Sequence, residues 1–108
     1  MRRGDLVTIA LQGDYGKPRP ALVIQSDFFA AHPSVTVLHV TSELRDAALF
    51  RVAVEPTPAN GLRSSSQVMV DKCMTVAREK VGPSFGRLDA GRMLEVERCL
   101  AVFLGIAE

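Results

Sequence analysis

The chain has 108 residues, of which 47% are hydrophobic and 23% charged, and its 13 Lys and Arg against 12 Asp and Glu give a net charge of +1. This length predicts one domain, residues 1–108, and the hydrophobic fraction argues against disorder. No run of about 18 apolar residues is present, so no membrane span is predicted. The N-terminal segment has two arginines but only a short, interrupted apolar stretch, which makes a poor signal peptide, so we expect a cytoplasmic protein.

Cysteine and histidine are too sparse for a disulfide framework or a metal site. Cys73 and Cys99 lack CxxC spacing and are expected to be reduced thiols, with Cys99 buried on a helix. His32 and His39 stand alone, and no cluster of His, Cys and Asp has the spacing of metal ligands. We therefore expect neither a metal nor another cofactor.

Short apolar runs, separated by loops that contain Gly, Pro and Ser, predict strands through the first two thirds of the chain. The predicted strands are residues 6–11, 19–25, 35–41, 50–55 and 67–76. A helical turn capped by Ser26 or Asp27 is expected after the second of them.

After Asp89 the apolar residues change to the period of a helix. Six residues are expected to form its apolar face: Met93, Leu94, Val96, Leu100, Phe103 and Leu104. Asp89 is the predicted N-cap, and Gly105 stands where a C-terminal glycine belongs. Strands followed by a helix predict an α+β domain in which the helix covers a small, curled antiparallel sheet.

Five segments, in order and with similar spacing, resemble the MazF/PemK (Kid) toxin family over the whole chain. They are residues 3–7 (RGDLV), 19–25 (RPALVIQ), 40–42 (VTS), 66–76 (SQVMVDKCMTV) and 86–88 (GRL). The resemblance implies an SH3-like barrel that forms a homodimer and acts as the toxin of a type II toxin–antitoxin pair. It also implies a metal-independent endoribonuclease that cuts single-stranded mRNA at short motifs, and a small cognate antitoxin that blocks the site.

RNA is cut in this way when its 2′-hydroxyl attacks the adjacent phosphate, which requires proton transfers and a cation on the phosphorane. The resemblance implies Arg19 and Thr41 as catalytic residues. A guanidinium presents a planar fork to phosphate oxygens and keeps its charge, which suits Arg19. The alternatives are that Arg19 is a strand-end charge bound to a carboxylate, and that Thr41 serves strand propensity alone.

Asp71 is the third catalytic candidate, because the PemK branch uses a matching aspartate as an acid or base. It is expected to share a strand face with Gln67 and Met69, away from Val68 and Val70. That branch has an arginine two residues before the aspartate, where this chain has Met69, so the arrangement is broken here. The alternative is a structural carboxylate at a turn or strand end.

Five residues are candidates for RNA contact: Tyr15, Lys17, His39, Gln67 and Lys72. Lys17 offers charge to phosphate and Tyr15 a ring for base stacking. Their loop is one residue shorter than the family pattern and lacks its Glu-Gln pair, for which Asp14 is a possible replacement, so no cleavage sequence is predicted.

His39 lies two residues before Thr41, which places both side chains on one strand face. A histidine there is either a proton carrier near neutral pH or part of a dimer interface or a partly buried wall.

Charged residues are unevenly distributed along the chain. Basic residues gather near the site segments: Arg2, Arg3, Lys17, Arg19, Lys72, Arg78 and Lys80. Acidic residues gather in and around the helix: Asp89, Glu95, Glu97 and Glu108. This separation predicts a phosphate-attracting patch if the fold brings the basic residues to one face, and a solvated surface otherwise.

Two other functions stay open. A gyrase-poisoning toxin of the CcdB type has the same fold but depends on a tail that ends Trp-Gly-Ile, whereas residues 104–106 here are Leu-Gly-Ile and Trp is absent. A catalytically inactive relative is the second, given Met69 and the shortened loop.

A dimer has modest support from the predicted strand 35–41. Val35 and Val37 share a face with Thr41, while Leu38 and Val40 occupy the other face. A strand that is apolar on both faces is expected to need cover beyond one core in so small a domain.

Overall fold

The structure is a computed structural model and describes residues 1–10 and 17–107. These residues form six strands: β1 (Asp5–Ala10), β2 (Pro18–Val23), β3 (Ser34–Thr41), β4 (Arg51–Val54), β5 (Ser66–Ala77) and β6 (Val81–Arg87). Two short 3-10 helices, η1 (Asp27–Phe29) and η2 (Arg78–Lys80), and one α-helix, α1 (Ala90–Phe103), complete the fold.

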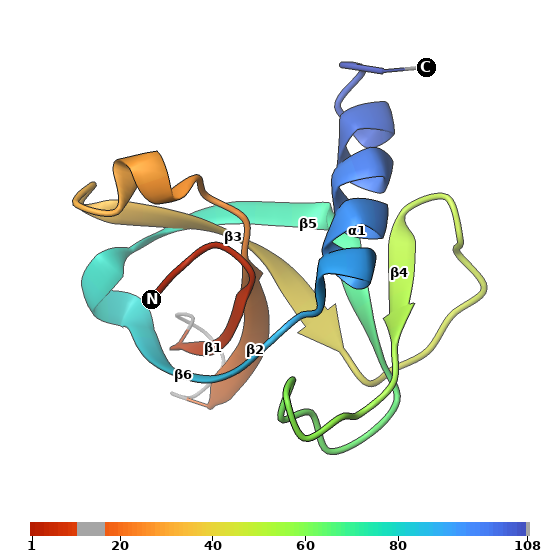
Figure 1. The fold of residues 1–108 in the computed structure, drawn as a ribbon, viewed down its shortest axis with the longest axis horizontal. Coiled ribbons are helices and arrows are strands. Elements are labelled where there is room, and N and C mark those ends of the chain that lie inside the picture. Colours follow the sequence, from red (N-terminus) through yellow and green to blue (C-terminus); the bar gives the residue numbers. More distant parts are fainter. Residues whose placement is uncertain (11–16, 108) are drawn as a thin grey trace.

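The strands form one antiparallel sheet with the order β4-β5-β3-β2-β1-β6. The sheet is not closed, because β4 and β6 are its edges. Figure 1 shows that it curls strongly, with β1, β2 and β6 sweeping round below β3 and β5, while α1 stands beside β4 and β5. The prediction of a curled antiparallel sheet with a C-terminal helix is confirmed.

Successive side chains of a strand alternate between two apolar clusters, one on each face of the sheet. The cluster that contains α1 consists of Leu6, Leu22, Leu38, Val40, Val52, Val54, Val68, Val70, Leu88, Met93 and Val96. The cluster on the opposite face, inside the curl, consists of Val7, Ile9, Ala21, Val23, Val35, Val37 and Val76.

Both faces of β3 are therefore covered within one chain. Val35 and Val37 belong to the inner cluster, Leu38 and Val40 belong to the cluster under α1, and all four are buried. The cover beyond one core that this strand was expected to need comes from within the chain, because curling the sheet gives it two cores. The dimer stays a prediction.

The strand Val81–Arg87 (β6) was not predicted from the sequence. It contains Gly82, Pro83 and Gly86, which weaken a strand pattern, and it pairs with β1 in an irregular register. Gly86 is required there because an added Cβ would lie 2.1 Å from the backbone oxygen of Asn60. The predicted bounds of the other five strands agree with the structure to within two residues wherever the chain is described.

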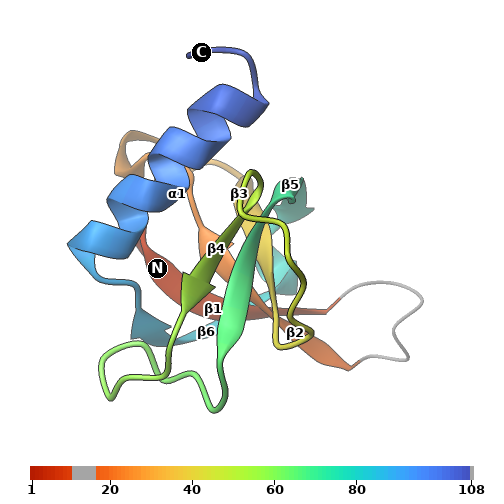
Figure 2. The same cartoon turned by 90° about the vertical axis from the view of Figure 1, so that its right-hand side faces the viewer.

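The helix begins and ends as predicted. The Asp89 side chain accepts a hydrogen bond from the Arg92 backbone N–H at 3.0 Å, and Gly105 has φ +76°. Met93 and Val96 are buried, whereas Leu94, Phe103 and Leu104 are 46%, 50% and 55% exposed. The prediction that these three belong to the packed face was therefore wrong. Phe103 and Leu104 are at the end of α1, which extends beyond the edge of the sheet (Figure 2).

The turn after β2 is also as predicted, since the Ser26 hydroxyl accepts from the Phe28 backbone N–H at 3.2 Å at the start of η1. In the described part of the chain, no helix is long and apolar enough to cross a membrane.

Candidate active site

The start of β2 and the end of β3 lie at the same end of neighbouring strands. Ala21 is opposite His39 in the ladder between them, so the antiparallel register continues toward Arg19 and Thr41. By strand alternation both side chains lie on the face that carries the inner apolar cluster, beyond its edge. Arg19 is exposed and pairs in the other direction with Ile9 of β1. At the end of the sheet where β2 begins and β3 ends, the inner face therefore carries polar side chains.

Thr41 lies directly opposite Gln67 of β5. Its Oγ1 accepts a hydrogen bond from the Glu43 backbone N–H at 3.0 Å, which fixes the side chain at the end of the strand. The hydroxyl proton has no acceptor among the described residues, so it is oriented by the Glu43 contact and available to a ligand.

Gln67 holds the segment that follows β3. Its Oε1 accepts from the Arg45 backbone N–H at 3.1 Å, and its Nε2 donates to the Arg45 carbonyl at 2.9 Å. The same Oε1 also accepts from Nη1 of Arg51 at 2.8 Å. Gln67 was predicted as an RNA contact, and these bonds make it a residue that positions its neighbours.

Arg51 is the site residue that sequence reasoning missed. It is half-buried on β4, directly opposite Met69, and its Nη1 donates to the Glu43 carbonyl at 2.9 Å as well as to Gln67. The sequence pattern that could have identified it is the alternation in residues 50–55, which places the Arg51 side chain on the opposite face of the strand from Val52.

His39 lies between Ala21 of β2 and Met69 of β5. The ring is half-buried, and its Nε2 lies 2.7 Å from the sulfur of Met74. His39 and Thr41 share a strand face, as expected from their spacing. The contact with Met74 agrees with the alternative in which His39 is a partly buried residue of the sheet.

Asp71 lies in an irregular part of β5. Leu38 pairs with Cys73 and the next residue, His39, pairs with Met69, so residues 70–72 bulge from the ladder. One carboxylate oxygen of Asp71, Oδ1, is buried with no hydrogen-bond partner, and Oδ2 lies 4.0 Å from Nζ of Lys72. The predicted faces are confirmed for Val68 and Val70, which are buried under α1, and for Gln67 and Met69, which are half-buried and pair with Thr41 and His39. Asp71 is half-buried within the bulge.

Lys17 and Lys72 are exposed, the first just before β2 and the second beside Asp71. Tyr15 and Asp14 lie outside the described residues.

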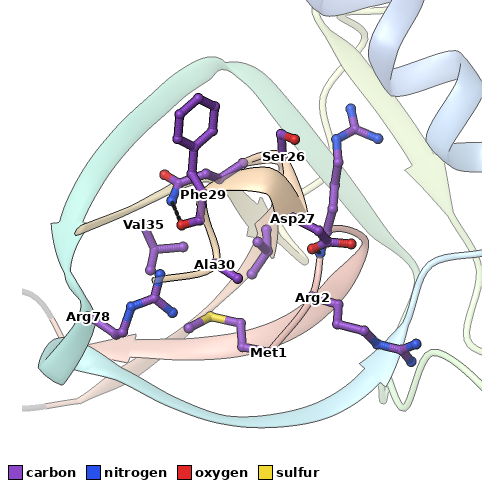
Figure 3. Close-up of a pocket in the computed structure, with 11 residues that line it drawn as sticks. Met1, Arg2, Ser26, Asp27, Phe29, Ala30, Val35 and Arg78 are labelled. Atoms are coloured by element: carbon purple, nitrogen blue, oxygen red, sulfur yellow. Dashed lines mark hydrogen bonds between the residues drawn. The ribbon is translucent and has the colours of Figure 1, made fainter. Parts of the chain in front are cut away.

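The predicted basic patch is divided between two ends of the sheet. Arg2, Arg3 and Arg78 line a pocket with Val23 at the end of β2 that is opposite Arg19. In Figure 3 Arg78 and Met1 lie on one side of this pocket, and Arg2 and Asp27 lie on the other. Two of these arginines are held by the protein itself: Arg3 pairs with Glu97 at 3.4 Å, and Arg78 Nε donates to the His32 carbonyl at 2.8 Å. They are therefore not part of the Arg19 site.

Both cysteines are free thiols, as expected. Burial raises the pKa of the Cys73 and Cys99 thiols. Cys99 is half-buried and its Sγ donates to the Leu49 carbonyl at 3.0 Å.

In the ranges 1–10 and 17–107, no three or more His, Cys, Asp or Glu residues are grouped so that they could hold a metal ion.

The fold is a small curled sheet in which Arg19 and Thr41 lie at the same end of neighbouring strands. Arginine and a hydroxyl group are side chains suited to bind a phosphodiester. The family model of the PemK-like, MazF-like toxin of type II toxin–antitoxin systems matches residues 2–104. A probable endoribonuclease MazF from Mycolicibacterium smegmatis is 51% identical over 108 residues, covering 99% of each chain. The chain therefore belongs to the PemK-like, MazF-like family of toxins.

Solved structures agree on the fold. The Mycobacterium tuberculosis toxin MazF-mt6 superposes with a TM-score of 0.81 at 24% identity, covering 96% of this chain and 99% of that one. An endoribonuclease in complex with its cognate antitoxin, from a mycobacterial species, also gives a TM-score of 0.81, at 20% identity, covering 100% and 98%. The resemblance predicted from five short segments is confirmed, and the gyrase alternative gains no support. The toxins of this family belong to type II toxin–antitoxin systems.

Proposed function

We propose that this toxin endoribonuclease cuts single-stranded RNA, including mRNA, by attack of the 2′-hydroxyl on the adjacent phosphate and without a metal. The observation that carries the proposal is the convergence of Arg19 and Thr41 at neighbouring ends of β2 and β3, on one polar face. Arginine and a hydroxyl donor at one place are the groups that a phosphate with developing negative charge requires.

In this mechanism Arg19 binds the non-bridging oxygens of the scissile phosphate. Thr41, held by the Glu43 backbone, donates its hydroxyl proton to one of the same oxygens. The bond from the 2′-oxygen to phosphorus forms as the bond from phosphorus to the 5′-oxygen breaks. Because charge on the phosphorane exceeds that of the ground state, both contacts strengthen in the transition state and lower the barrier.

Asp71 is our candidate for moving a proton, either from the 2′-hydroxyl or to the leaving 5′-oxygen. The unpartnered Oδ1 of its carboxylate supports this role, because a buried acceptor without a donor is unfavourable until a ligand supplies one. His39 is the alternative, but its Nε2 already faces the sulfur of Met74.

RNA contacts outside the reacting atoms are assigned to the residues around this face. Lys17 and Lys72 are exposed and supply charge to phosphates. Gln67 and His39 line the face, and Tyr15 keeps its proposed part in base stacking. The specificity for a short motif is expected to come from these contacts and from the loop before β2.

We further propose that residues 1–108 act as one toxin domain in the cytoplasm, where mRNA is available, and that two copies form a homodimer. The exposed apolar side chains at the end of α1 offer a surface for association: Val102, Phe103, Leu104 and Ile106. A sedimentation mass of one chain at micromolar concentration would contradict the dimer.

The activity is tested by incubating a long single-stranded RNA with antitoxin-free protein in EDTA, beside Arg19→Ala and a control, Arg98→Gln, on the exposed side of α1. Discrete fragments with 2′,3′-cyclic phosphate and 5′-hydroxyl ends are expected from the wild type and the control, and none from Arg19→Ala. A folded wild-type protein that cuts no RNA in EDTA would overturn the metal-independent mechanism. Full activity of Arg19→Ala would overturn only the role of Arg19.

A further inference from the structure

We propose that Arg51 is a second phosphate-binding residue of this site, which holds a different backbone phosphate of the RNA from the one bound by Arg19. The inference rests on the proposed function and deepens it. Three independent observations support it: an uncompensated charge, a fixed orientation and a place on the inner face of the sheet.

The charge of Arg51 lacks a counter-ion in the protein. Both hydrogen bonds of its guanidinium go to neutral oxygens, the Glu43 carbonyl and the Gln67 amide, and no carboxylate lies within 4.0 Å among the described residues. Its Nε is buried without a partner. A half-buried cation is unfavourable unless an anion accompanies it, so the site is suited to an incoming anion.

Other arginines of the chain differ from Arg51 in this respect. Four of them are paired with carboxylates: Arg3 with Glu97, Arg45 with Glu43, Arg87 with Asp5, and Arg92 with Glu95. Their charges are satisfied without a ligand, whereas that of Arg51 is not.

The Arg51 side chain is also held in a fixed orientation. Both hydrogen bonds of the guanidinium are made by Nη1, and Gln67, which accepts one of them, is itself held by two bonds to the Arg45 backbone. The other terminal nitrogen, Nη2, makes no hydrogen bond to any residue that the structure describes. A guanidinium fixed in this way binds a phosphate without a further loss of side-chain entropy.

The place of Arg51 connects it with the proposed catalytic residues. Met69, which lies opposite Arg51, shares its face with Gln67, and Gln67 lies opposite Thr41. In the sheet order, β4 is three strands from β2, so Arg51 and Arg19 are about 14 Å apart when measured along the curled sheet. Their place on strands separated by β3 and β5 suits contacts to two phosphates of one RNA strand.

The proposal is tested by RNA binding rather than by cleavage. The RNA cut by the wild type is made uncleavable by a 2′-O-methyl group at the cleaved nucleotide, and its Kd is measured at several salt concentrations. Arg51→Gln is compared with Arg98→Gln, which removes the same charge from the helix on the opposite face. We expect Arg51→Gln to weaken binding about tenfold or more at low salt. We also expect it to reduce the slope of log K against log salt by about 0.7, the value for one phosphate contact on a single strand, with both quantities unchanged in the control.

A purely structural part for Arg51, such as holding the segment after β3 or pairing with Asp71, would lower the melting temperature and leave the salt slope at the wild-type value. That result would overturn the proposal, as would an unchanged Kd. Arg51→Lys keeps the charge and replaces Arg51→Gln in the test if Arg51→Gln does not fold. We expect it to keep the wild-type slope of log K against log salt while losing part of the affinity for RNA. A slope that falls by about 0.7, the value expected for loss of one phosphate contact, would contradict the proposal. Failure of the wild type to bind or cut RNA would overturn the proposed function and this inference together.

Discussion

Arg87 and Asp5, 82 positions apart in the sequence, form an ion pair in which Nη1 of Arg87 donates to Oδ1 of Asp5 at 2.6 Å. The carboxylate is buried and also accepts from the Arg2 backbone N–H at 2.8 Å. Arg87 donates from Nη2 to the Arg3 carbonyl at 3.0 Å. The pair therefore ties the start of β1 to the end of β6, just before α1, and makes both residues part of the scaffold that positions the site.

Replacing Asp5 by alanine is expected to lower the free energy of unfolding by about 2–3 kcal/mol, because Arg87 and the Arg2 N–H lose a buried charged acceptor. Urea denaturation measures this loss. The matched control is Glu43→Ala, which removes an ion pair of the same 2.6 Å length to Arg45 from an exposed position. The control should cost less than about 1 kcal/mol, and equal losses in the two variants would contradict the role of burial.

Gly86→Ala is expected to destabilise the protein by several kcal/mol, on the order of 3 or more, because the added methyl group would collide with the backbone of Asn60 and Ala59. Gly105→Ala is the comparison. Its φ of +76° makes alanine unfavourable by about 1 kcal/mol, but nothing lies within 4 Å of the added Cβ. Thermal melting should rank Gly86→Ala far below Gly105→Ala, and the reverse order would show that the contact with residues 59–60 is wrongly placed.

Thr41→Val preserves the shape of the side chain and removes only the hydroxyl. We expect a decrease of about 100-fold in the single-turnover rate of RNA cleavage, the size associated with one donor to a developing oxyanion. Thr36→Val is the control on the same strand, where the hydroxyl bonds Thr75 at 2.9 Å at the end away from the site. Equal rates in Thr41→Val and the wild type would remove Thr41 from the mechanism.

Asp71→Asn separates catalysis from stability. The unpartnered Oδ1 contributes nothing to folding, so we expect a melting temperature equal to or above that of the wild type. If the carboxylate transfers a proton, the cleavage rate should fall about 100-fold or more while binding of the uncleavable RNA is retained. A lower melting temperature together with full cleavage would make Asp71 a structural residue.

The thiol of Cys99 is expected to react slowly with iodoacetamide at neutral pH. Burial raises its pKa, and the bond from Sγ to the Leu49 carbonyl also favours the protonated form. The same shift predicts a loss of stability at alkaline pH, because above the ordinary thiol pKa the unfolded chain releases its proton before the folded chain does. Mass spectrometry of a Cys73→Ser variant measures the reaction, with the urea-unfolded variant as the control. A folded thiol that reacts as fast as the unfolded one would contradict the shift.

Local patterns were sufficient for most of the secondary structure. The alternation of Val52 with its neighbours, the helical spacing of Met93 and Val96, and the Asp89 cap depend on residues close in sequence, so they could be recognised without a structure. β6 could not, because its Gly and Pro residues resemble a loop, and what makes it a strand is the edge of β1, more than 70 positions earlier.

The sequence by itself determined the α+β architecture, and its short motifs carried the resemblance that implied the family and the candidates Arg19, Thr41 and Asp71, since such patterns depend on residues close in the chain. Only the tertiary structure decided which charges share a surface. It separated Arg3 and Arg78 from Arg19, and it placed Arg51 directly opposite Met69, the residue that replaces the arginine of the PemK branch. The physical reason is that strand pairing and the curl of the sheet are set by hydrogen bonds and packing between distant segments. A change of one residue in the register would turn each of these side chains to the other face.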